Sequence, residues 1–164
     1  PLGSTVRLVV ERGQGTRITV TLERADIRNR AVSRAVVLDG NVGYVAVTTF
    51  SDSTERELIA AVDSLRGAGA NSLVLDLRGN PGGLLEQGVG VADLFLVPGQ
   101  QIVTTRGRAE NSNKVYVDST AERWAGMPMA VLVNPLTASA AEIVAGALQD
   151  HDRAVVLGRV SYGK

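Results

Sequence analysis

The stretch Ser72–Gly83, which reads SLVLDLRGNPGG, gives the clearest indication of the fold class. Its first half, Ser72–Leu77, is a short and nearly continuous apolar run, as is typical of a strand buried on both faces of a parallel sheet. A glycine-rich loop, Arg78–Gly83, follows it, and a segment with helical periodicity, Leu84–Leu96, comes next. A buried strand that passes through a tight loop into a helix predicts an α/β domain.

Outward from this stretch, strand-like and helix-like segments alternate along most of the chain. Strands are expected at Ala35–Asp39, Val42–Val47, Gln101–Arg106, Val115–Val117, Met129–Val133 and Ala154–Gly158. Helices are expected at Glu55–Arg66, Leu84–Leu96 and Ala138–Asp150. This alternation predicts one α/β domain over residues 35–164, with a mostly parallel sheet.

The first residues of the chain have a different pattern. Pro1–Ser4 resembles the scar left after removal of an expression tag. Val6–Glu11 and Arg17–Arg24 are rich in β-forming residues, and polar and apolar residues alternate over Arg17–Glu23, which predicts a half-buried β-hairpin. Because a lone hairpin is only marginally stable, residues 5–28 are interpreted as the closing strands of a domain whose beginning is missing. A charged connector, Asp26–Arg34, leads from them to the α/β domain.

The composition argues against several classes of function. The chain has 164 residues, of which 45% are hydrophobic and 21% are charged, as in an ordinary folded domain. Lys+Arg and Asp+Glu number 17 each, so nucleic-acid binding driven by net positive charge is not expected. The sequence has no cysteine, which excludes disulfides, thiolate zinc sites and cysteine nucleophiles. No apolar run is long enough to cross a bilayer.

The glycine-rich loop is the first candidate site. Gly79, Gly82 and Gly83 would let backbone N–H groups approach a ligand closely and hold an anion or an oxyanion. The simpler interpretation is a tight turn from a strand into a helix. The loop matches neither the GxGxxG dinucleotide pattern nor the GxxxxGK[ST] phosphate-binding pattern.

The second candidate site is Ser139, at the start of an apolar helix. Ser139 and Glu142 have the spacing of a capping box, which by itself explains both residues. The functional alternative is a serine nucleophile at a helix N-terminus, where free N–H groups favour developing negative charge. The small residues Ala138, Ala140 and Ala141 would leave room for a substrate.

A serine nucleophile needs a base. The only histidine, His151, lies twelve residues beyond Ser139 on the same predicted helix. At 1.5 Å of rise per residue it is roughly 18 Å away, out of hydrogen-bonding reach. The remaining candidate is Lys164, which would have to lose its proton through burial among apolar groups. An exposed Lys164 would stay charged and could not act as a base.

Residues Gly158–Lys164 offer a competing interpretation. They read GRVSYGK, which is a phosphate-binding G-x-x-x-x-G-K loop without its final Ser or Thr and without its helix. Arg159, Val160 and Tyr162 are bulky for a loop that must wrap phosphates. A nucleotide-binding protein therefore stays open as the less favoured alternative.

Three motifs together resemble the carboxyl-terminal processing, or tail-specific, proteases. They are Ser72–Gly83, Asn134–Asp150 (NPLTASAAEIVAGALQD) and Arg153–Lys164 (RAVVLGRVSYGK), and they occur in the order found in that family. The resemblance runs from about Ala35 to Lys164. It implies an α/β core related to the crotonase and Clp-protease folds, preceded by a PDZ domain of which residues 5–28 would be the last strands.

The resemblance also implies roles for individual residues. Ser139 would be the nucleophile and Lys164 the general base. Backbone N–H groups of Gly82, Gly83 and Ala140 would hold the oxyanion.

The same resemblance implies supporting roles for Asp76, Arg78 and Glu142. The implied reaction is endoproteolysis near the carboxyl terminus of a protein through an acyl-enzyme. It involves no cofactor, metal or nucleic acid.

The resemblance further implies partners and a location. Substrates would be unstructured or carboxyl-terminal tails of proteins, in the periplasm, the cell envelope or a plastid lumen. The family has a glutamine four residues beyond the lysine, and Lys164 is the last residue here. The chain is therefore expected to be a core truncated at its carboxyl end, with little activity of its own.

Unpaired sheet edges would favour a homo-oligomer. A non-catalytic peptide-binding or scaffold homologue is the alternative.

Overall fold

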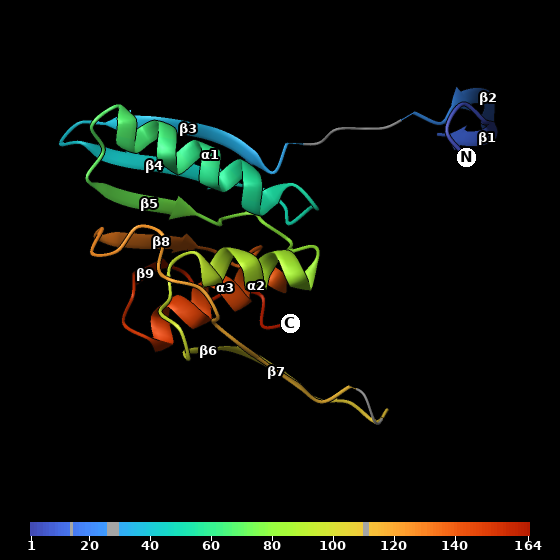
Figure 1. Cartoon of the computed structure of the whole chain (residues 1–164). Coiled ribbons are helices and arrows are strands. Elements are labelled where there is room, and N and C mark those ends of the chain that lie inside the picture. Colours follow the sequence, from blue (N-terminus) through green and yellow to red (C-terminus); the bar gives the residue numbers. More distant parts are fainter. Residues whose placement is uncertain (14, 26–29, 110–111) are drawn as a thin grey trace.

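The computed structural model describes residues 1–13, 15–25, 30–109 and 112–164. A five-stranded sheet in the order β3-β4-β5-β8-β9 forms the body of the chain (Figure 1). Its strands are β3 (Val32–Leu38), β4 (Val42–Val47), β5 (Ser72–Asp76), β8 (Met129–Val133) and β9 (Val155–Gly158). Strand β3 is antiparallel to β4, and all the other neighbours are parallel. The predicted α/β class with a mostly parallel sheet is confirmed.

The described part of this body contains the helices α1 (Thr54–Gly67), α2 (Leu85–Asp93) and α3 (Ala140–Asp150). Helix α1 lies on β3 and β4, whereas α3 contacts β9 and α2 (Figure 1). Helix α1 buries Leu58, Val62 and Leu65, which recur at helical spacing. Helices α2 and α3 approach closely at Gly88, where the lack of a side chain makes room for Ala140. A Cβ added at Gly88 would lie 3.1 Å from the Cβ of Ala140.

The two faces of the central sheet are buried to different extents. Leu73 and Leu75 of β5 are almost inaccessible to solvent, but Val74 between them is only half-buried. The same alternation occurs in β4 and β8. The expectation that Ser72–Leu77 is buried on both faces is therefore wrong for this chain, because the three helices cover only one face fully.

Two hairpins complete the chain. Strands β6 (Gln101–Thr105) and β7 (Lys114–Val117) pair antiparallel, as do β1 (Thr5–Arg12) and β2 (Thr16–Glu23). Figure 1 shows β1 and β2 apart from the α/β body. The expected antiparallel pairing of this first hairpin is present, but nearly all of its residues are exposed, so the expectation of a half-buried hairpin is wrong for this chain.

Several predicted boundaries move in the structure. Residues 26–29 of the expected connector lie outside the described residues, and β3 begins earlier than predicted, at Val32. Helix α2 ends at Asp93 instead of Leu96. No helix in the described ranges is long and apolar enough to span a membrane.

Candidate active site

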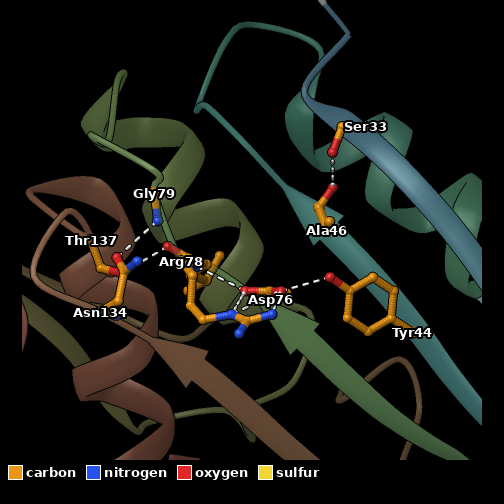
Figure 2. A network of polar contacts seen from close by, with 9 residues as sticks. Ser33, Tyr44, Ala46, Asp76, Arg78, Gly79, Asn134 and Thr137 are labelled. Atoms are coloured by element: carbon orange, nitrogen blue, oxygen red, sulfur yellow. Dashed lines mark hydrogen bonds and ion pairs between the residues drawn. The ribbon is translucent and has the colours of Figure 1, made fainter. Parts of the chain in front are cut away.

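The loops that follow the neighbouring parallel strands β5 and β8 meet at the carboxyl edge of the sheet. The Gly79 N–H donates to Oδ1 of Asn134 (2.9 Å; Figure 2). The hydroxyl of the fully buried Thr137 donates to the carbonyl of Leu77 (2.8 Å). These bonds hold the glycine-rich loop against the turn that leads into α3. Both candidate motifs therefore lie at the sheet edge where ligands bind in folds of this class.

Ser139 occupies a strained turn directly before α3. Its backbone has φ +56° and ψ −121°, and a serine rarely adopts a positive φ. The predicted capping box is present, and the Ser139 N–H donates to Oε2 of Glu142 (2.8 Å). The cap and the functional interpretation are thus compatible. A serine on a sharp strand-to-helix turn has the geometry of an exposed nucleophile.

Gly82 lies against this turn with no space for a side chain. A Cβ added at Gly82 would be 2.7 Å from the Cβ of Ser139 and 2.9 Å from the backbone nitrogen of Ala140. Its φ of +93° also favours glycine. The glycine-rich loop and the Ser139 turn are therefore brought together at backbone contact distance.

The N–H groups around Ser139 differ in their partners. Gly82 donates its N–H to Oδ1 of Asn80 (2.8 Å), so this expected oxyanion donor is engaged by the protein itself in this structure. The Phe50 N–H donates to the Gly82 carbonyl (3.0 Å) in a parallel bridge with Gly83, which turns the Gly83 N–H away from Phe50. Within the described ranges, neither the Gly83 nor the Ala140 N–H donates a hydrogen bond. These two groups remain as candidate oxyanion donors.

Glu142 connects Ser139 to the end of the chain. Its Oε2 accepts from the N–H groups of Ser139 (2.8 Å) and Lys164 (3.0 Å). Its Oε1 accepts from the Ser161 hydroxyl (2.7 Å) and the Gly163 N–H (2.6 Å). Partial burial works to raise the pKa of Glu142, but these donors outweigh it, so the pKa lies below its ordinary value. Glu142 is therefore a carboxylate at neutral pH, shared between the serine turn and the lysine segment.

The two candidate bases lie differently. The backbone of Lys164 is held beside the site, but its side chain is exposed, and among the described residues it makes no hydrogen bond to Ser139. His151 lies at the other end of α3, where its Nε2 is 2.8 Å from the carbonyl oxygen of Gln101. The structure thus agrees with the expectation that the histidine does not serve Ser139.

The segment Gly158–Lys164 does not form a phosphate-binding loop. Several of its N–H groups donate to protein acceptors: that of Arg159 to the Val133 carbonyl, that of Tyr162 to the Thr137 carbonyl, and that of Gly163 to Glu142. The Glu142 carboxylate, which accepts from the N–H groups of Gly163 and Lys164, would repel an anion that approached them. The nucleotide-binding alternative is disfavoured by this arrangement.

Asp76 and Arg78 form a compact ion pair at the end of β5. Nε and Nη2 of Arg78 donate to the carboxylate of Asp76 (2.9 and 2.6 Å), and the Tyr44 hydroxyl donates to Oδ2 (2.6 Å; Figure 2). Burial works to raise the pKa of Asp76, but the bonds from Arg78 and Tyr44 outweigh it and lower the pKa. The bond to Asp76, together with burial, raises the pKa of Tyr44. Asp76 is 6% exposed and is charged at neutral pH.

Replacing Tyr44 by phenylalanine should weaken this network. Loss of a hydrogen bond to a buried carboxylate is expected to lower the free energy of unfolding by about 2 kcal/mol at neutral pH. Because Asp76 titrates below its ordinary pKa of 3.8 in the folded protein, the loss should shrink as the pH falls below that value. Urea unfolding of both proteins at several pH values measures this.

Tyr116→Phe is the matched control, since no hydrogen bond of the Tyr116 hydroxyl occurs in the described part of the chain. An equal loss of stability in both variants would contradict the role of the Tyr44 hydroxyl.

Sequence reasoning missed three residues of this site. Asn80, Tyr44 and Ser161 all bond to groups at the carboxyl edge of the sheet. Asn80 lies inside the glycine-rich motif. An asparagine in a turn often forms a hydrogen bond between its side chain and the nearby backbone, so its residue type could have indicated this role. Tyr44 and Ser161 carried no local signal, because their partners are 32 and 19 residues away.

Comparison with known proteins identifies the family. The profile described as peptidase family S41 matches residues 41–164. This chain belongs to peptidase family S41. Its fold agrees, since a structure named photosystem II D1 C-terminal processing protease superposes with a TM-score of 0.70 at 29% identity, covering 99% of this chain and 45% of that one.

Curated relatives carry related names. The chain is 38% identical over 162 residues to carboxy-terminal processing protease CtpA of Bacillus subtilis, covering 99% of this chain and 34% of that protein. It is 38% identical over 172 residues to chloroplastic carboxyl-terminal-processing peptidase 2 of Arabidopsis thaliana, covering 100% of this chain and 33% of that protein. The S41 chain thus spans about a third of the length of these relatives.

Proposed function

We propose that this chain is the catalytic core of a serine endopeptidase that cleaves proteins near their carboxyl terminus. The backbone conformation of Ser139 and the N–H groups near it support this proposal most directly. The serine sits at a positive φ directly before α3, in contact with the glycine-rich loop at Gly82, and within the described ranges the N–H groups of Gly83 and Ala140 donate no hydrogen bond. The substrate class comes from the relatives' names, carboxy-terminal processing protease among them.

In the proposed reaction, Oγ of Ser139 attacks the scissile carbonyl carbon and its proton passes to the neutral amine of Lys164. The N–H groups of Gly83 and Ala140 hold the oxyanion of the tetrahedral intermediate. The C–N bond then breaks, and Lys164 returns the proton to the leaving amine. Water then attacks the acyl-enzyme and gives a proton to Lys164. The ester bond to Ser139 breaks, and Lys164 returns this proton to Oγ of Ser139.

This mechanism requires a movement of one side chain. A lysine is a base only when neutral, and neutrality near pH 7 requires burial. The side chain of Lys164 is exposed here, while its backbone is fixed by Glu142. In the productive state the amine turns onto Ser139 and is covered by substrate or by flanking protein. Asp76 and Arg78 support the site from the end of β5.

The test is cleavage of an unstructured protein with an apolar carboxyl-terminal tail, between about pH 6 and pH 10. Ser139→Ala and Lys164→Ala should each lower kcat by at least about a thousandfold. Lys114→Ala is the control, because Lys114 is the other lysine and lies exposed in β7, in the second hairpin. Wild-type activity should rise with pH through one ionisation.

Two outcomes would contradict the proposal. Retained activity in Lys164→Ala would remove the lysine from its role as base. A wild-type protein that neither cleaves nor reacts at Ser139 would favour the peptide-binding or scaffold alternative. The test uses this chain and a form extended to the length of its relatives, and we expect the 164-residue chain alone to cleave little.

The proposal extends to the first hairpin, the type of core fold, the location of the protein and its self-association. The hairpin β1–β2 presents an apolar face, in which Leu8 pairs with Val20 and Val10 with Ile18, all of them at least one third exposed. We propose that residues 5–28 belong to a PDZ domain, whose other strands would cover this face. We also propose a crotonase- and Clp-protease-like core, an extracytoplasmic location and self-association through unpaired sheet edges.

A further inference from the structure

We infer that Asn80 is the positioning residue that sets the oxyanion site. The inference rests on the proposed function, since it concerns the N–H groups beside Ser139. Asn80 is completely buried, and neither the serine chemistry nor the Asp76–Arg78 pair uses it. Its position within the loop makes it a shared support for three segments of the chain.

The side chain of Asn80 ties the glycine-rich loop to the sheet. Its Nδ2 donates to the carbonyl of Val47 at the end of β4 (2.9 Å). Its Oδ1 accepts from the Gly82 N–H (2.8 Å). A buried amide with both ends engaged has one favourable orientation, so it fixes the peptide plane of Gly82.

The backbone of Asn80 holds the serine turn. Its carbonyl accepts from the Ala138 N–H (2.9 Å), one residue before Ser139. The same residue thus fixes the loop that carries one candidate oxyanion donor and the turn that carries the other. A shift of Asn80 would move both.

The choice of donor follows from this arrangement. Because Oδ1 of Asn80 takes the Gly82 N–H, that group cannot bind a substrate oxygen. The bridge between Phe50 and Gly83 turns the next N–H, that of Gly83, to the opposite side. Gly83 is exposed, so a substrate carbonyl can reach its N–H. Asn80 therefore selects Gly83 over Gly82 as the oxyanion donor.

The first test needs no activity. Amide hydrogen exchange measured by NMR on the 164-residue chain should show a protected Gly82 N–H and a fast-exchanging Gly83 N–H. In Asn80→Ala the Gly82 N–H should lose its protection by at least about tenfold. A protected Gly83 N–H with an unprotected Gly82 N–H in the wild-type chain would overturn the inference.

The second test is kinetic, in the shortest form of the protein that shows Ser139-dependent cleavage. Asn80→Ala should lower kcat by about 10- to 100-fold with KM changed less than about threefold, because only the transition state gains from an oriented donor. Trp124→Phe is the control for lost stability. Trp124 is 2% exposed and its indole N–H donates to Oδ1 of Asp63 (2.8 Å), at a site that the mechanism does not use.

A transition-state mimic separates positioning from folding. A peptide aldehyde should lose about 10- to 100-fold in affinity for Asn80→Ala, whereas a substrate peptide bound to the Ser139→Ala background should lose little. Equal losses of affinity for both ligands, or a kcat equal to that of Trp124→Phe, would overturn the inference.

If Asn80→Ala does not fold, Asn80→Asp is the second variant for the same test. Its Oδ1 can still accept from Gly82, and protonation restores a donor to Val47, so its kcat relative to wild type should rise as the pH falls. A ratio independent of pH would count against the inference.

The proposed function and the role of Asn80 would be contradicted by different results. If Ser139→Ala keeps its activity, the proposed function is wrong. If Ser139→Ala is inactive and the Asn80 variants behave like Trp124→Phe, only the role of Asn80 is wrong.

Discussion

Gly82→Ala is expected to lower the free energy of unfolding by about 3 kcal/mol and to abolish cleavage. A methyl group at this position would lie 2.7 Å from the Ala138 carbonyl oxygen and 2.7 Å from the Cβ of Ser139. Both neighbours belong to the tight turn before α3, so neither can move without changing the serine. Urea unfolding and peptide cleavage measure the two effects.

Gly99→Ala is the matched control for the backbone part of this effect. Gly99 has φ +95°, against +93° at Gly82, and a Cβ there would meet nothing within 4 Å. It should cost only about 1–2 kcal/mol, the price of a positive φ in an alanine, and should leave cleavage intact. Equal effects of the two substitutions would show that the loop does not contact the serine turn in solution.

The fold was largely predictable because its decisive segments are local. Ser72–Gly83 contains a whole strand and the loop after it, and Met129–Val133 is predicted without a shift in either boundary. The sequence did not predict the burial of individual side chains correctly where that burial depends on elements distant in the chain. Val74 is half-buried because the helices cover one face of the sheet only, and no property of the strand itself reveals this.

The candidate site was predictable as a set of motifs but not as a geometry. The spacing of Ser139 and Glu142 predicted the capping box that the structure contains. It could not show that the same carboxylate also binds Gly163 and Lys164, more than twenty residues further along the chain. Nor could it show which glycine N–H is free, because that depends on the side chain of Asn80.

Glu142→Gln is expected to lower kcat by about 100-fold and the free energy of unfolding by about 2 kcal/mol. A glutamine has one acceptor oxygen and one NH₂ donor, but Glu142 faces donors at both oxygens. One amide end must therefore point a donor at another donor, either at Ser139 and Lys164 or at Ser161 and Gly163. The lysine segment should detach and lose its alignment with Ser139.

The matched control for that substitution is Glu86→Gln. Glu86 also lies in the first turn of a helix, α2, so both variants lose a similar interaction with the helix dipole, but Glu86 is exposed and makes no hydrogen bond within the described ranges. Hydrogen exchange of the Gly163 and Lys164 amides and kcat should change in Glu142→Gln only. Because the folded pKa of Glu142 lies below 4.5, the protection of these amides in the wild type should persist at neutral pH and disappear as the pH falls through that lowered pKa. Protection that is unchanged in Glu142→Gln would mean that the segment is held by other contacts, and that the carboxylate does not link the serine to the lysine.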